Sequence, residues 1–431
     1  METSQLYKYF LECGKVTIDT RDCPKGSMFI ALKGATFNGN TFASQAIANG
    51  CLYAVVDEAE YANDSDGRIL LVDDCLKALQ NLAAWHRHIL GTKMIGITGT
   101  NGKTTTKELI AAVLKEKYNV LYTQGNLNNH IGVPLTLLKL TSEHEMAVVE
   151  MGANHPGEIK TLVNMACPDY GIITNVGKAH LEGFGSFEGV IRTKGELYDY
   201  IRENGGKIFI QNENPYLNSI AGGLECIRYG AEEDLFVSGK VLSCSPFLFF
   251  SWKSEGKSHE VQTHLIGSYN VDNALAAVSI GRYFDVEDDA ICHALSSYEP
   301  RNNRSQLVEA CGNRFVIDAY NANPTSMAAA LENFRMIEAE HKMVILGDMK
   351  ELGDASLEEH QKVIDMLVDY GFDRVILVGP EFGKTVNSFE HFDNTDEVYS
   401  ILSSDMPNGY MILIKGSNSM KLAELFEMLM K

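Results

Sequence analysis

Short apolar runs alternate with helical patterns through the middle of the chain. The apolar runs have the length and composition of buried strands and lie at residues 94–97, 146–150, 170–174 and 207–211. Between the first two runs, Leu109, Val113 and Leu114 recur at helical spacing. Strands that alternate with helices predict βαβ units and a mostly parallel sheet. A β-rich segment at residues 237–262 interrupts the alternation, and a helical pattern follows at residues 271–283.

The first 80 residues have a different pattern, in which short apolar pieces surround one helical stretch. The strand-like pieces lie at residues 16–18, 28–32, 53–56 and 69–72. The helical stretch covers residues 42–49, and a second helical pattern at residues 76–88 leads into the strand that begins near residue 94. We therefore predict a small α/β domain at residues 1–80 and a central domain at residues 81–300.

From about residue 301 the alternation restarts and predicts a third α/β domain, residues 301–431. Its strands are expected at residues 314–318, 342–346, 374–378 and 411–415, and its helices at residues 324–337, 357–370 and 420–430. Asn323 is predicted to cap the first of these helices, with Pro324 as its first residue. This third part has no GxGxxG sequence, so dinucleotide binding is not predicted.

Length, charge and cysteine usage narrow the classes of protein. The 431 residues suggest about three domains. A net charge of −20 argues against a general nucleic-acid binder, which needs clustered lysine and arginine. The nine cysteines form no CxxC pair, which favours a reducing compartment. No signal peptide and no apolar stretch of ~18 residues is evident, so we expect a cytoplasmic, monomeric protein without stable membrane association.

A glycine-rich sequence, GTNGKTTT, follows the apolar run at residues 94–97 and precedes a helical pattern. In a phosphate-binding loop the backbone amides face the phosphates, a lysine contacts them, and a hydroxyl binds Mg²⁺. Lys103 and Thr104 fit the last two roles. The match is imperfect because Ile97 stands where the usual motif begins with glycine, and a plain turn with a solvated lysine is the alternative. The predicted ATP-binding residues here are Gly99, Thr100, Asn101, Gly102, Lys103, Thr104 and Thr105.

Glu150 ends the apolar run MAVVE, where the acidic partner of a phosphate-loop Mg²⁺ is usually found. We predict that it binds the metal together with Thr104. A strand-end glutamate in solvent is the alternative.

Three further stretches are dense in polar residues: GNLNNHIGVP (125–134), NVGKAHLEGFGSFEGVIRTKGEL (175–197) and DAYNANPTS (318–326). Each alone could be a turn or a helix cap. Together with GTNGKTTT, and with VVEMGANHPGEI, GSYNVDNALAA, LGDMKELG and LIKGSNSMKL, they resemble the Mur ligase family over the whole chain. The segment at 18–42 is similar to that family's uridine-nucleotide domain, although DTR replaces the commoner DSR at 19–21, and His130 stands where relatives vary.

The resemblance implies three domains: a small α/β UDP-substrate domain, a central P-loop ATPase domain and a C-terminal Rossmann-like domain. It also implies an ATP- and Mg²⁺-dependent ligase of bacterial cell-wall synthesis that forms an amide bond through an acyl phosphate. DAYNANP and GDMKELG favour UDP-MurNAc-tripeptide and D-Ala-D-Ala as its two substrates. The third residue of the peptide, diaminopimelate or lysine, is not predicted.

The resemblance also implies roles for residues outside the phosphate loop. His180 would bind a second Mg²⁺, and Lys194 would form a carbamate with CO₂ that binds or orients this metal; a loop histidine without a ligand role and an unmodified lysine are the alternatives. Arg304 would approach the phosphates and Asp318 the ribose. The predicted catalytic residues are thus Lys103, His180, Lys194 and Arg304.

Amide side chains complete the implied sites. Asn270 and Asn273 are expected to precede a helix and to lie near the adenine, with helix capping as the alternative. Asn321, in the same segment as Asp318, is also expected to bind ATP. The predicted substrate-binding residues are Thr20, Arg21, Asn38, Gly39, Asn126, Asn128, Asn129, Asn323, Lys415, Gly416 and Ser417.

Three other functions remain open at this point. Sister ligases that add one amino acid, and folylpolyglutamate synthase-like enzymes, share the ATPase core but should lack DAYNANP and the 18–42 pattern. A P-loop regulatory switch would need no acceptor site and no second metal-binding cluster. Phosphate release that requires both acceptor and amine separates a ligase from a switch.

Overall fold

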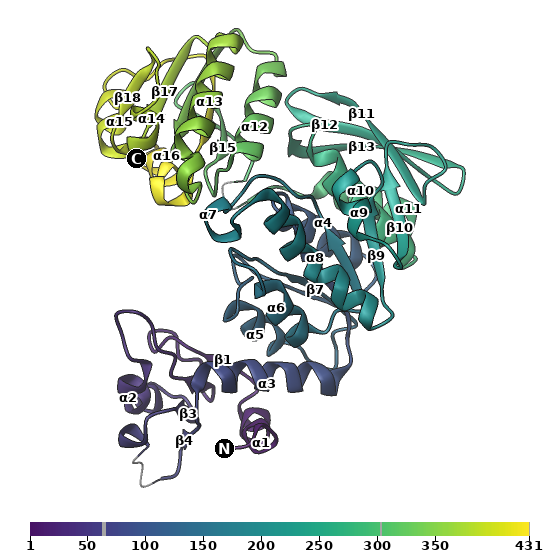
Figure 1. Cartoon of the computed structure of the whole chain (residues 1–431), viewed down its shortest axis with the longest axis vertical. Helices are drawn as coiled ribbons and strands as arrows, with labels where there is room; N and C mark the ends of the chain where they lie inside the picture. The colour runs from purple at the N-terminus through teal and green to yellow at the C-terminus, as the bar shows by residue number, and fades with distance from the viewer. Residues whose placement is uncertain (63–65, 302–303, 431) are drawn as a thin grey trace.

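The computed structural model describes residues 1–62, 66–301 and 304–430 of the chain. Three units, each built on its own β-sheet, follow one another along the chain (Figure 1). The N-terminal unit packs at one end of the central unit, and the C-terminal unit lies at the other end. The α/β class and the three-part architecture predicted from the sequence are confirmed.

The N-terminal unit has a four-stranded parallel sheet in the order β1-β2-β3-β4. The strands are β1 (Val16–Thr17), β2 (Met28–Ile30), β3 (Tyr53–Val56) and β4 (Ile69–Leu71), with helices α1 (Thr3–Cys13) and α2 (Ala43–Ala48). The four predicted strands are confirmed, whereas α1 was not predicted. Its Leu6 and Phe10 are buried against this unit's core.

A long helix, α3 (Cys75–Leu90), connects the N-terminal and central units (Figure 1). It begins at Asp74, whose side chain accepts a hydrogen bond from the amide of Lys77, and it ends at Gly91 in the left-handed conformation. It contacts α1 on one side and helices of the central unit on the other. Because this helix runs through residue 80, the first predicted domain boundary falls inside a continuous helix. The boundaries at 80 and 300 stay a prediction.

The central unit has a nine-stranded sheet in the order β13-β12-β11-β10-β9-β8-β5-β7-β6. Its strands are β5 (Lys93–Thr98), β6 (Val120–Tyr122), β7 (Met146–Glu150), β8 (Tyr170–Ile173), β9 (Lys207–Gln211), β10 (Glu225–Gly230), β11 (Val237–Cys244), β12 (Phe247–Ser254) and β13 (Lys257–Ile266). Neighbours pair in parallel from β6 to β11, and only β11-β12-β13 pair antiparallel. The mostly parallel sheet with a β-rich segment is therefore confirmed.

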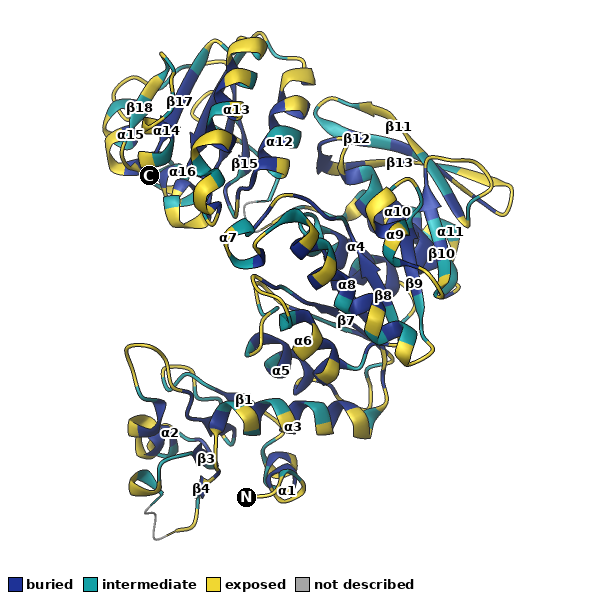
Figure 2. Ribbon diagram, viewed as in Figure 1, coloured by how far each residue is buried: buried dark blue, intermediate teal, exposed yellow. Residues whose placement is uncertain are grey.

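Helices cover both faces of this sheet, and the strands between them are buried (Figure 2). One face packs against α4 (Lys103–Lys115), α10 (Asn270–Tyr283) and α11 (Asp288–Ser297). The other packs against α5 (Gly132–Leu137), α6 (Glu158–Ala166) and α8 (Phe187–Glu203). Two short helices, α7 (Leu181–Phe184) and α9 (Pro215–Ile220), complete this unit. Because both faces of these strands are buried, apolar residues occupy consecutive positions in their sequences.

The C-terminal unit has a six-stranded sheet in the order β14-β15-β19-β16-β17-β18, parallel except for β14. The strands are β14 (Gln306–Ala310), β15 (Asn313–Asp318), β16 (His341–Gly347), β17 (Arg374–Val378), β18 (Glu390–Phe392) and β19 (Tyr410–Lys415). Helices α12 (Pro324–Met336) and α13 (Ser356–Tyr370) pack on one face, and α15 (Thr395–Leu402) and α16 (Leu422–Leu429) on the other. A one-turn helix, α14 (Pro380–Gly383), follows β17.

The predicted start of α12 is confirmed. The Asn323 side chain accepts from the amide of Ser326 at 2.9 Å, the Ser326 hydroxyl accepts from the amide of Asn323 at 3.1 Å, and Pro324 is the first helical residue. This reciprocal pair satisfies two amides that the first turn would otherwise leave without a partner.

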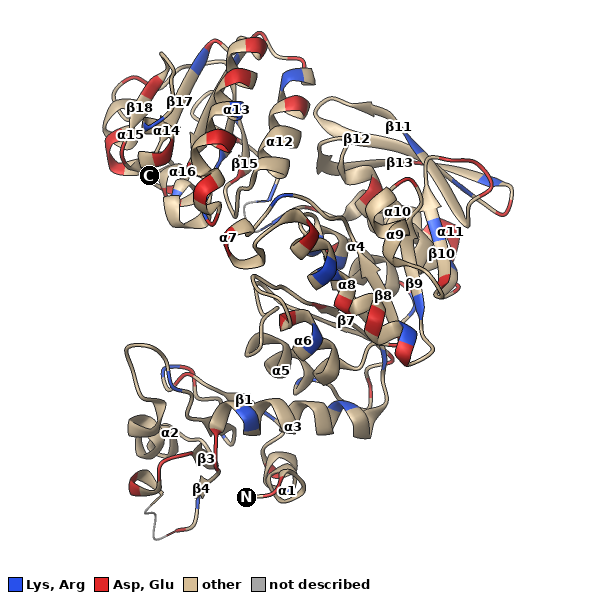
Figure 3. Cartoon of the chain, in the orientation of Figure 1, with Lys and Arg blue, Asp and Glu red and all other residues tan. Residues whose placement is uncertain are grey.

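Acidic and basic residues are spread over all three units, and several acidic ones lie on α13 (Figure 3). Within the described ranges, no helix combines the length and the apolar character needed to cross a lipid bilayer.

Candidate active site

The glycine-rich loop lies between β5 and α4, with β5 flanked by β7 and β8 in the sheet. Gly99 has φ of +143° and Gly102 has φ of +76°. A Cβ at Gly99 would lie 2.0 Å from Oγ1 of Thr174, and one at Gly102 would lie 2.7 Å from Oδ1 of Asn273. Both the backbone conformation and the space therefore require glycine, as in a loop whose backbone closely surrounds a phosphate.

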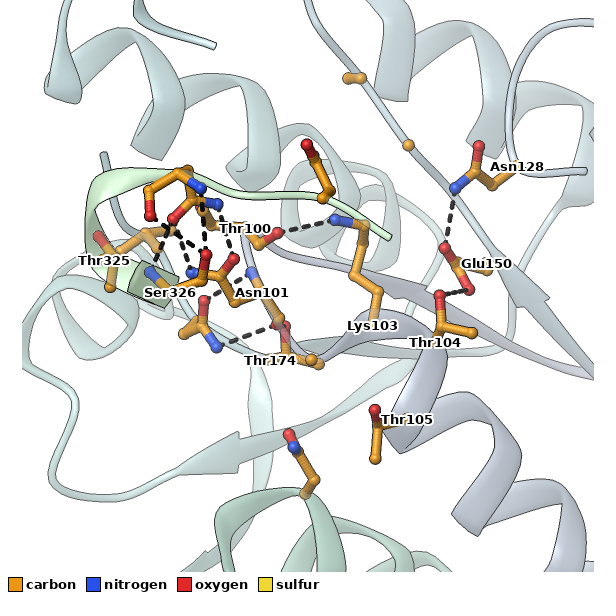
Figure 4. A pocket seen from close by; sticks show the side chains of 18 of the residues that line it. Thr100, Asn101, Lys103, Thr104, Thr105, Asn128, Glu150, Thr174, Thr325 and Ser326 are labelled. Carbon is orange, nitrogen blue, oxygen red and sulfur yellow. Dashed lines mark hydrogen bonds between the residues drawn. The ribbon is translucent and has the colours of Figure 1, made fainter. Parts of the chain in front are cut away.

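Residues that follow β8 hold the loop in shape (Figure 4). The amides of Thr100 and Asn101 donate to the backbone and side-chain oxygens of Asn175, each at 2.9 Å. The Thr174 hydroxyl donates to the carbonyl of Asn101 at 2.6 Å. Thr174 and Asn175 were not predicted to have a role, although their position directly after a buried strand was a usable signal.

Lys103 begins α4, and its ammonium group donates to the carbonyls of Gly99 and Thr100 at 2.8 and 2.9 Å (Figure 4). Desolvation lowers the pKa of Lys103 to about 8, an effect that Glu150 opposes and Arg304 increases. The ammonium group therefore lies inside the loop, at the N-terminus of a helix, where anions bind.

Glu150 is buried at the end of β7 and holds two neighbours (Figure 4). The Thr104 hydroxyl donates to its Oε2 at 3.0 Å, and the Asn128 amide donates to its Oε1 at 2.8 Å. Lys107 is fully buried behind this pair, with Nζ 3.9 Å from Oε2 of Glu150 and 3.0 Å from Oε1 of Glu108. Lys107, one helical turn after Lys103, was not predicted to have a role.

The oxygens of Thr104, Glu150 and Asn128 are hard ligands of the kind that Mg²⁺ prefers. Among the described residues, no group of three or more His, Cys, Asp or Glu side chains could hold a metal ion. One carboxylate beside a phosphate loop fits Mg²⁺ that is bound mainly through nucleotide phosphates and water.

A cavity of about 1110 Å³ opens in front of the loop, between the central and C-terminal units. Its size suits a nucleotide with a second substrate. The residues predicted from sequence that line it are Thr100, Asn101, Gly102, Lys103, Thr104, Thr105, Asn128, Asn129, Glu150, His180, Asn270, Asn273, Arg304, Asp318, Asn321, Asn323 and Lys415.

Asn270 and Asn273 lie in the first turn of α10, so the expectation that they precede a helix is wrong. Neither caps it: the cap residue is Tyr269, without a side-chain hydrogen bond. Asn273 donates to Oδ1 of Asn270 at 2.7 Å and accepts from the Thr106 hydroxyl at 2.9 Å. Asn270 also donates to the carbonyl of Ile266 at 2.8 Å, so both buried side chains are held in place by contacts within the protein at the cavity wall.

The C-terminal unit contributes a second set of charged side chains. The Arg304 guanidinium lies 3.7 Å from the centre of the Tyr320 ring, and its buried Nε has no hydrogen-bond partner among the described residues. Asp318 accepts from the buried ammonium group of Lys415 at 2.6 Å, and Lys415 also donates to the carbonyl of Asn321 at 3.3 Å. Arg304 therefore adds a second cation to the cavity that holds Lys103.

A pair of amides joins the two units at the loop itself. Asn323 donates from Nδ2 to Oδ1 of Asn101 at 2.8 Å, and Asn101 donates back at 3.4 Å. Asn323 thus caps α12 and contacts the phosphate loop at once.

We expect Asn323→Ala to lower the free energy of unfolding by about 1 kcal/mol, the usual cost of a lost cap, and also to slow ATP turnover. Asn394→Ala is the matched control, because Asn394 caps α15 by accepting from Glu397 at 3.1 Å and does not line the cavity. Denaturant unfolding and steady-state phosphate release measure the two effects. Equal turnover in both variants would show that the contact with Asn101 has no catalytic consequence.

Comparison with known proteins assigns all three units to one family. Models of the Mur ligase family match as its catalytic domain at residues 13–87, its middle domain at 97–281 and its glutamate ligase domain at 303–418. The UDP-N-acetylmuramoyl-tripeptide–D-alanyl-D-alanine ligase of Bacillus subtilis is 35% identical over 95% of this chain and 92% of its own. The ligase of the same name from Escherichia coli is 36% identical with the same coverage.

The chain belongs to the Mur ligase family.

Solved structures agree with this assignment. The MurF structure from Acinetobacter baumannii has a TM-score of 0.88 and 30% identity, and covers 99% of this chain and 98% of its own. MurF ligase from Thermotoga maritima, solved in complex with ADP, has a TM-score of 0.85 and 27% identity over 97% of both chains.

The two residues that the Mur ligase resemblance placed at a second metal both pack against the ring of Phe184. His180 lines the cavity with φ of +50°, and its Nδ1 contacts Oε2 of Glu351 in the C-terminal unit. Burial lowers the pKa of His180. Lys194 is buried behind the cavity wall and donates to the carbonyl of Ala153 at 3.2 Å. Burial, and then the charge of Lys103, lower the pKa of Lys194 to about 7.

Several predicted substrate-binding residues do not line the cavity, and their contact with a substrate stays a prediction. Lys415 lines the cavity, whereas the Ser417 hydroxyl accepts from the amide of Lys350 at 3.0 Å and Gly416 packs against Gly347. Asn126 is exposed away from it. Asn129 lines it, but its side chain also accepts from the amides at the start of α5.

The four residues predicted to contact UDP lie in the N-terminal unit, outside the cavity. Arg21 is exposed and pairs with Asp19, and the carbonyl of Thr20 accepts from Asn49. Asn38 donates to Glu58, and Gly39 is packed closely against the backbone of Leu32. Their contact with a nucleotide sugar stays a prediction.

Proposed function

We propose that this chain is the ligase that joins D-alanyl-D-alanine to UDP-N-acetylmuramoyl-tripeptide, converting ATP to ADP and phosphate. One observation carries the proposal: the phosphate loop, the buried Glu150 and the DAYNANP segment converge on one cavity in a member of the Mur ligase family. The product is the UDP-N-acetylmuramoyl-pentapeptide of peptidoglycan synthesis.

Cationic side chains line the cavity in which the negatively charged ATP and carboxylate would react. A carboxylate is a poor electrophile, so its oxygen first attacks the γ-phosphorus of ATP and forms an acyl phosphate. The dipeptide amine then attacks the acyl carbon, and the tetrahedral intermediate expels phosphate. Lys103 and Arg304 neutralise the oxygens of the transferred group, and charges held in place before the reaction are the most effective stabilisers of such steps.

Thr104, Glu150 and Asn128 are the residues that would hold Mg²⁺ beside the nucleotide phosphates. When bound, the metal polarises the phosphoryl oxygens and neutralises their charge. Glu150 is kept in place by its two hydrogen bonds and by Lys107 behind it, so its carboxylate is oriented before the nucleotide binds.

The remaining nucleotide contacts come from two units. Asn270 and Asn273 offer amide groups for the base from the central unit. Asp318 offers a carboxylate for the ribose, held by Lys415 in the C-terminal unit. A site shared between units is completed only when they meet, which excludes water from the reactive acyl phosphate. Thr20, Arg21, Asn38 and Gly39 are proposed to bind the UDP part, within a domain that ends near residue 80.

Lys194 is proposed to carry a carbamate. Carbamate formation needs a neutral amine, and a lysine whose pKa is lowered to about 7 is largely neutral just above pH 7. The new carboxylate would replace a buried amine with two oxygen ligands close to His180. An unmodified lysine at this position would supply no oxygen ligand.

We expect Lys194→Met to lower ligation by about 10²-fold while changing how stability depends on pH. The pKa of Lys194 is lower in the folded chain than its ordinary value of 10.5, so between pH 7 and 10.5 the unfolded chain binds more protons and the free energy of unfolding rises with pH. The variant should lose this rise and unfold at a higher temperature than the parent near pH 7, in CO₂-depleted buffer. Parallel pH profiles of the unfolding temperature would contradict this account.

Phosphate release tests the proposed function. The chain is supplied with ATP, Mg²⁺ and UDP-MurNAc-tripeptide, and then with D-Ala-D-Ala, single D-Ala or no amine. Release that requires both the acceptor and the dipeptide supports the proposal. Release with a single amino acid would instead make it a sister ligase, and nucleotide binding without release in any mixture would make it a regulatory switch.

A further inference from the structure

Glu351 connects the C-terminal unit to the central unit through two contacts. Glu351 lies in the GDMKELG segment of the C-terminal unit, and its Oε2 contacts Nδ1 of His180 in the central unit. The backbone carbonyl of Glu351 also accepts from the amide of Glu182 at 3.4 Å. Both the side chain and the backbone of Glu351 therefore reach the turn that carries His180.

The loop that presents Glu351 is rigidly supported. Glu351 has φ of +64°, a left-handed conformation that is unfavourable for a residue with a side chain. The preceding amides are held from behind: Met349 donates to Nε2 of the buried His360 at 3.0 Å, and Lys350 donates to the Ser417 hydroxyl at 3.0 Å. Strain of this kind persists only where the surroundings fix it, and it is common where a side chain must point at a functional group.

The conformation of His180 is also fixed by its surroundings. His180 has φ of +50°, and its ring packs edge-on against the Phe184 ring, with 6.1 Å between the ring centres. Its Nδ1 is buried from solvent. The residue nevertheless lines the cavity. A carboxylate can only accept hydrogen bonds, so it fixes the proton of a neutral imidazole on Nδ1 and leaves the lone pair on Nε2.

Other contacts between the same two units lie beside the His180 turn. Lys178 pairs with Glu359 at 3.0 Å, and its amide donates to the Thr325 hydroxyl at 3.2 Å. These contacts flank the His180 turn and join the same two units. The orientation of His180 is thus coupled to the placement of the C-terminal unit.

We propose that Glu351 is a positioning residue: by holding the proton on Nδ1 of His180, it directs Nε2 into the cavity as a ligand for a cation, and only when the C-terminal unit is in place. The cation-binding part of this inference rests on the proposed function, whereas the effect on the tautomer does not. Carboxylates that orient a metal-binding histidine in this way commonly change metal affinity or activity by about 10–100-fold when removed.

The tautomer of His180 is the direct test. The full chain is labelled with ¹⁵N-histidine, and the ring nitrogens are observed at pH 8, where the ordinary imidazole is neutral. A His180→Gln variant identifies the signal. We expect the proton on Nδ1 in the parent, and a shift towards Nε2 in Glu351→Gln. The control Glu359→Gln removes a neighbouring contact between the units without touching His180, and should leave the tautomer unchanged.

A second measurement follows the Mg²⁺ concentration that gives half-maximal phosphate release. Glu351→Gln should raise it about 10–100-fold, Glu351→Asp should restore part of the loss, and Glu359→Gln should change it little. The proposal is overturned if the proton lies on Nε2 in the parent, or if Glu351→Gln and Glu359→Gln behave alike in both measurements. The expected tautomer in a chain that never releases phosphate would leave the positioning effect intact and remove the proposed function instead.

Discussion

Lys103→Ala is expected to lower the rate of ATP-dependent ligation by about 10³-fold or more, the scale on which enzymes lose rate when a cation or donor facing the transferred group is removed. The ammonium group of Lys103 lies inside the phosphate loop at the start of α4. Its charge is needed most when the γ-phosphoryl group is in transit, so kcat should fall more than the affinity for ATP.

Two further variants test whether the loss of ligation activity is specific to Lys103. Lys103→Arg keeps a cation but not its compact shape and should recover little activity. Lys139→Ala removes an exposed lysine on the same unit and should behave like the parent. Steady-state phosphate release and nucleotide binding separate kcat from affinity. A parent-like kcat in Lys103→Ala would mean that the loop does not perform the reaction.

The second large effect is expected for Glu150→Gln. This change keeps the size of the side chain and its contact with Thr104 but removes the charge that would hold Mg²⁺. We expect ligation to fall by about 10²-fold or more and the Mg²⁺ requirement to rise. Because Lys107 is fully buried against Glu150 and, among the described residues, keeps only Glu108 as an acidic neighbour, the free energy of unfolding should fall by about 1–3 kcal/mol.

A double variant separates the effect of Glu150→Gln on stability from its effect on activity. Adding Lys107→Met to Glu150→Gln removes the buried cation that lost its partner, so stability should return towards that of the parent. Activity should stay low because the metal-binding carboxylate is still missing. Recovery of both stability and activity would show that Glu150 acts only in folding.

The central strands of the sheets were predictable because both of their faces are buried. Residues 146–150, 207–211 and 374–378 were located to the residue, since a parallel strand covered on both faces is a continuous apolar run. Helix α1 was missed because it begins without a side-chain cap and buries only Leu6, Tyr7 and Phe10. Strands β14 and β18 are half-exposed, so their composition did not separate them from loops.

The site was predictable to the extent that its residues lie in local motifs. Lys103 and Glu150 each occupy a position that a strand and its adjoining turn define. Lys107 and Glu351 act through contacts with residues distant in sequence, and no local pattern indicates such contacts. For Gly416 and Ser417, which contact a neighbouring loop and do not line this cavity, substrate binding stays a prediction.

One reaction tests the account most directly. UDP-MurNAc-tripeptide labelled with ¹⁸O in its terminal carboxylate is incubated with the chain, ATP, Mg²⁺ and D-Ala-D-Ala, and the masses of all products are measured. The account predicts ADP, phosphate that carries one ¹⁸O, and a nucleotide sugar heavier by one dipeptide less one labelled water. Unlabelled phosphate, release of AMP, or an unchanged nucleotide sugar would contradict it.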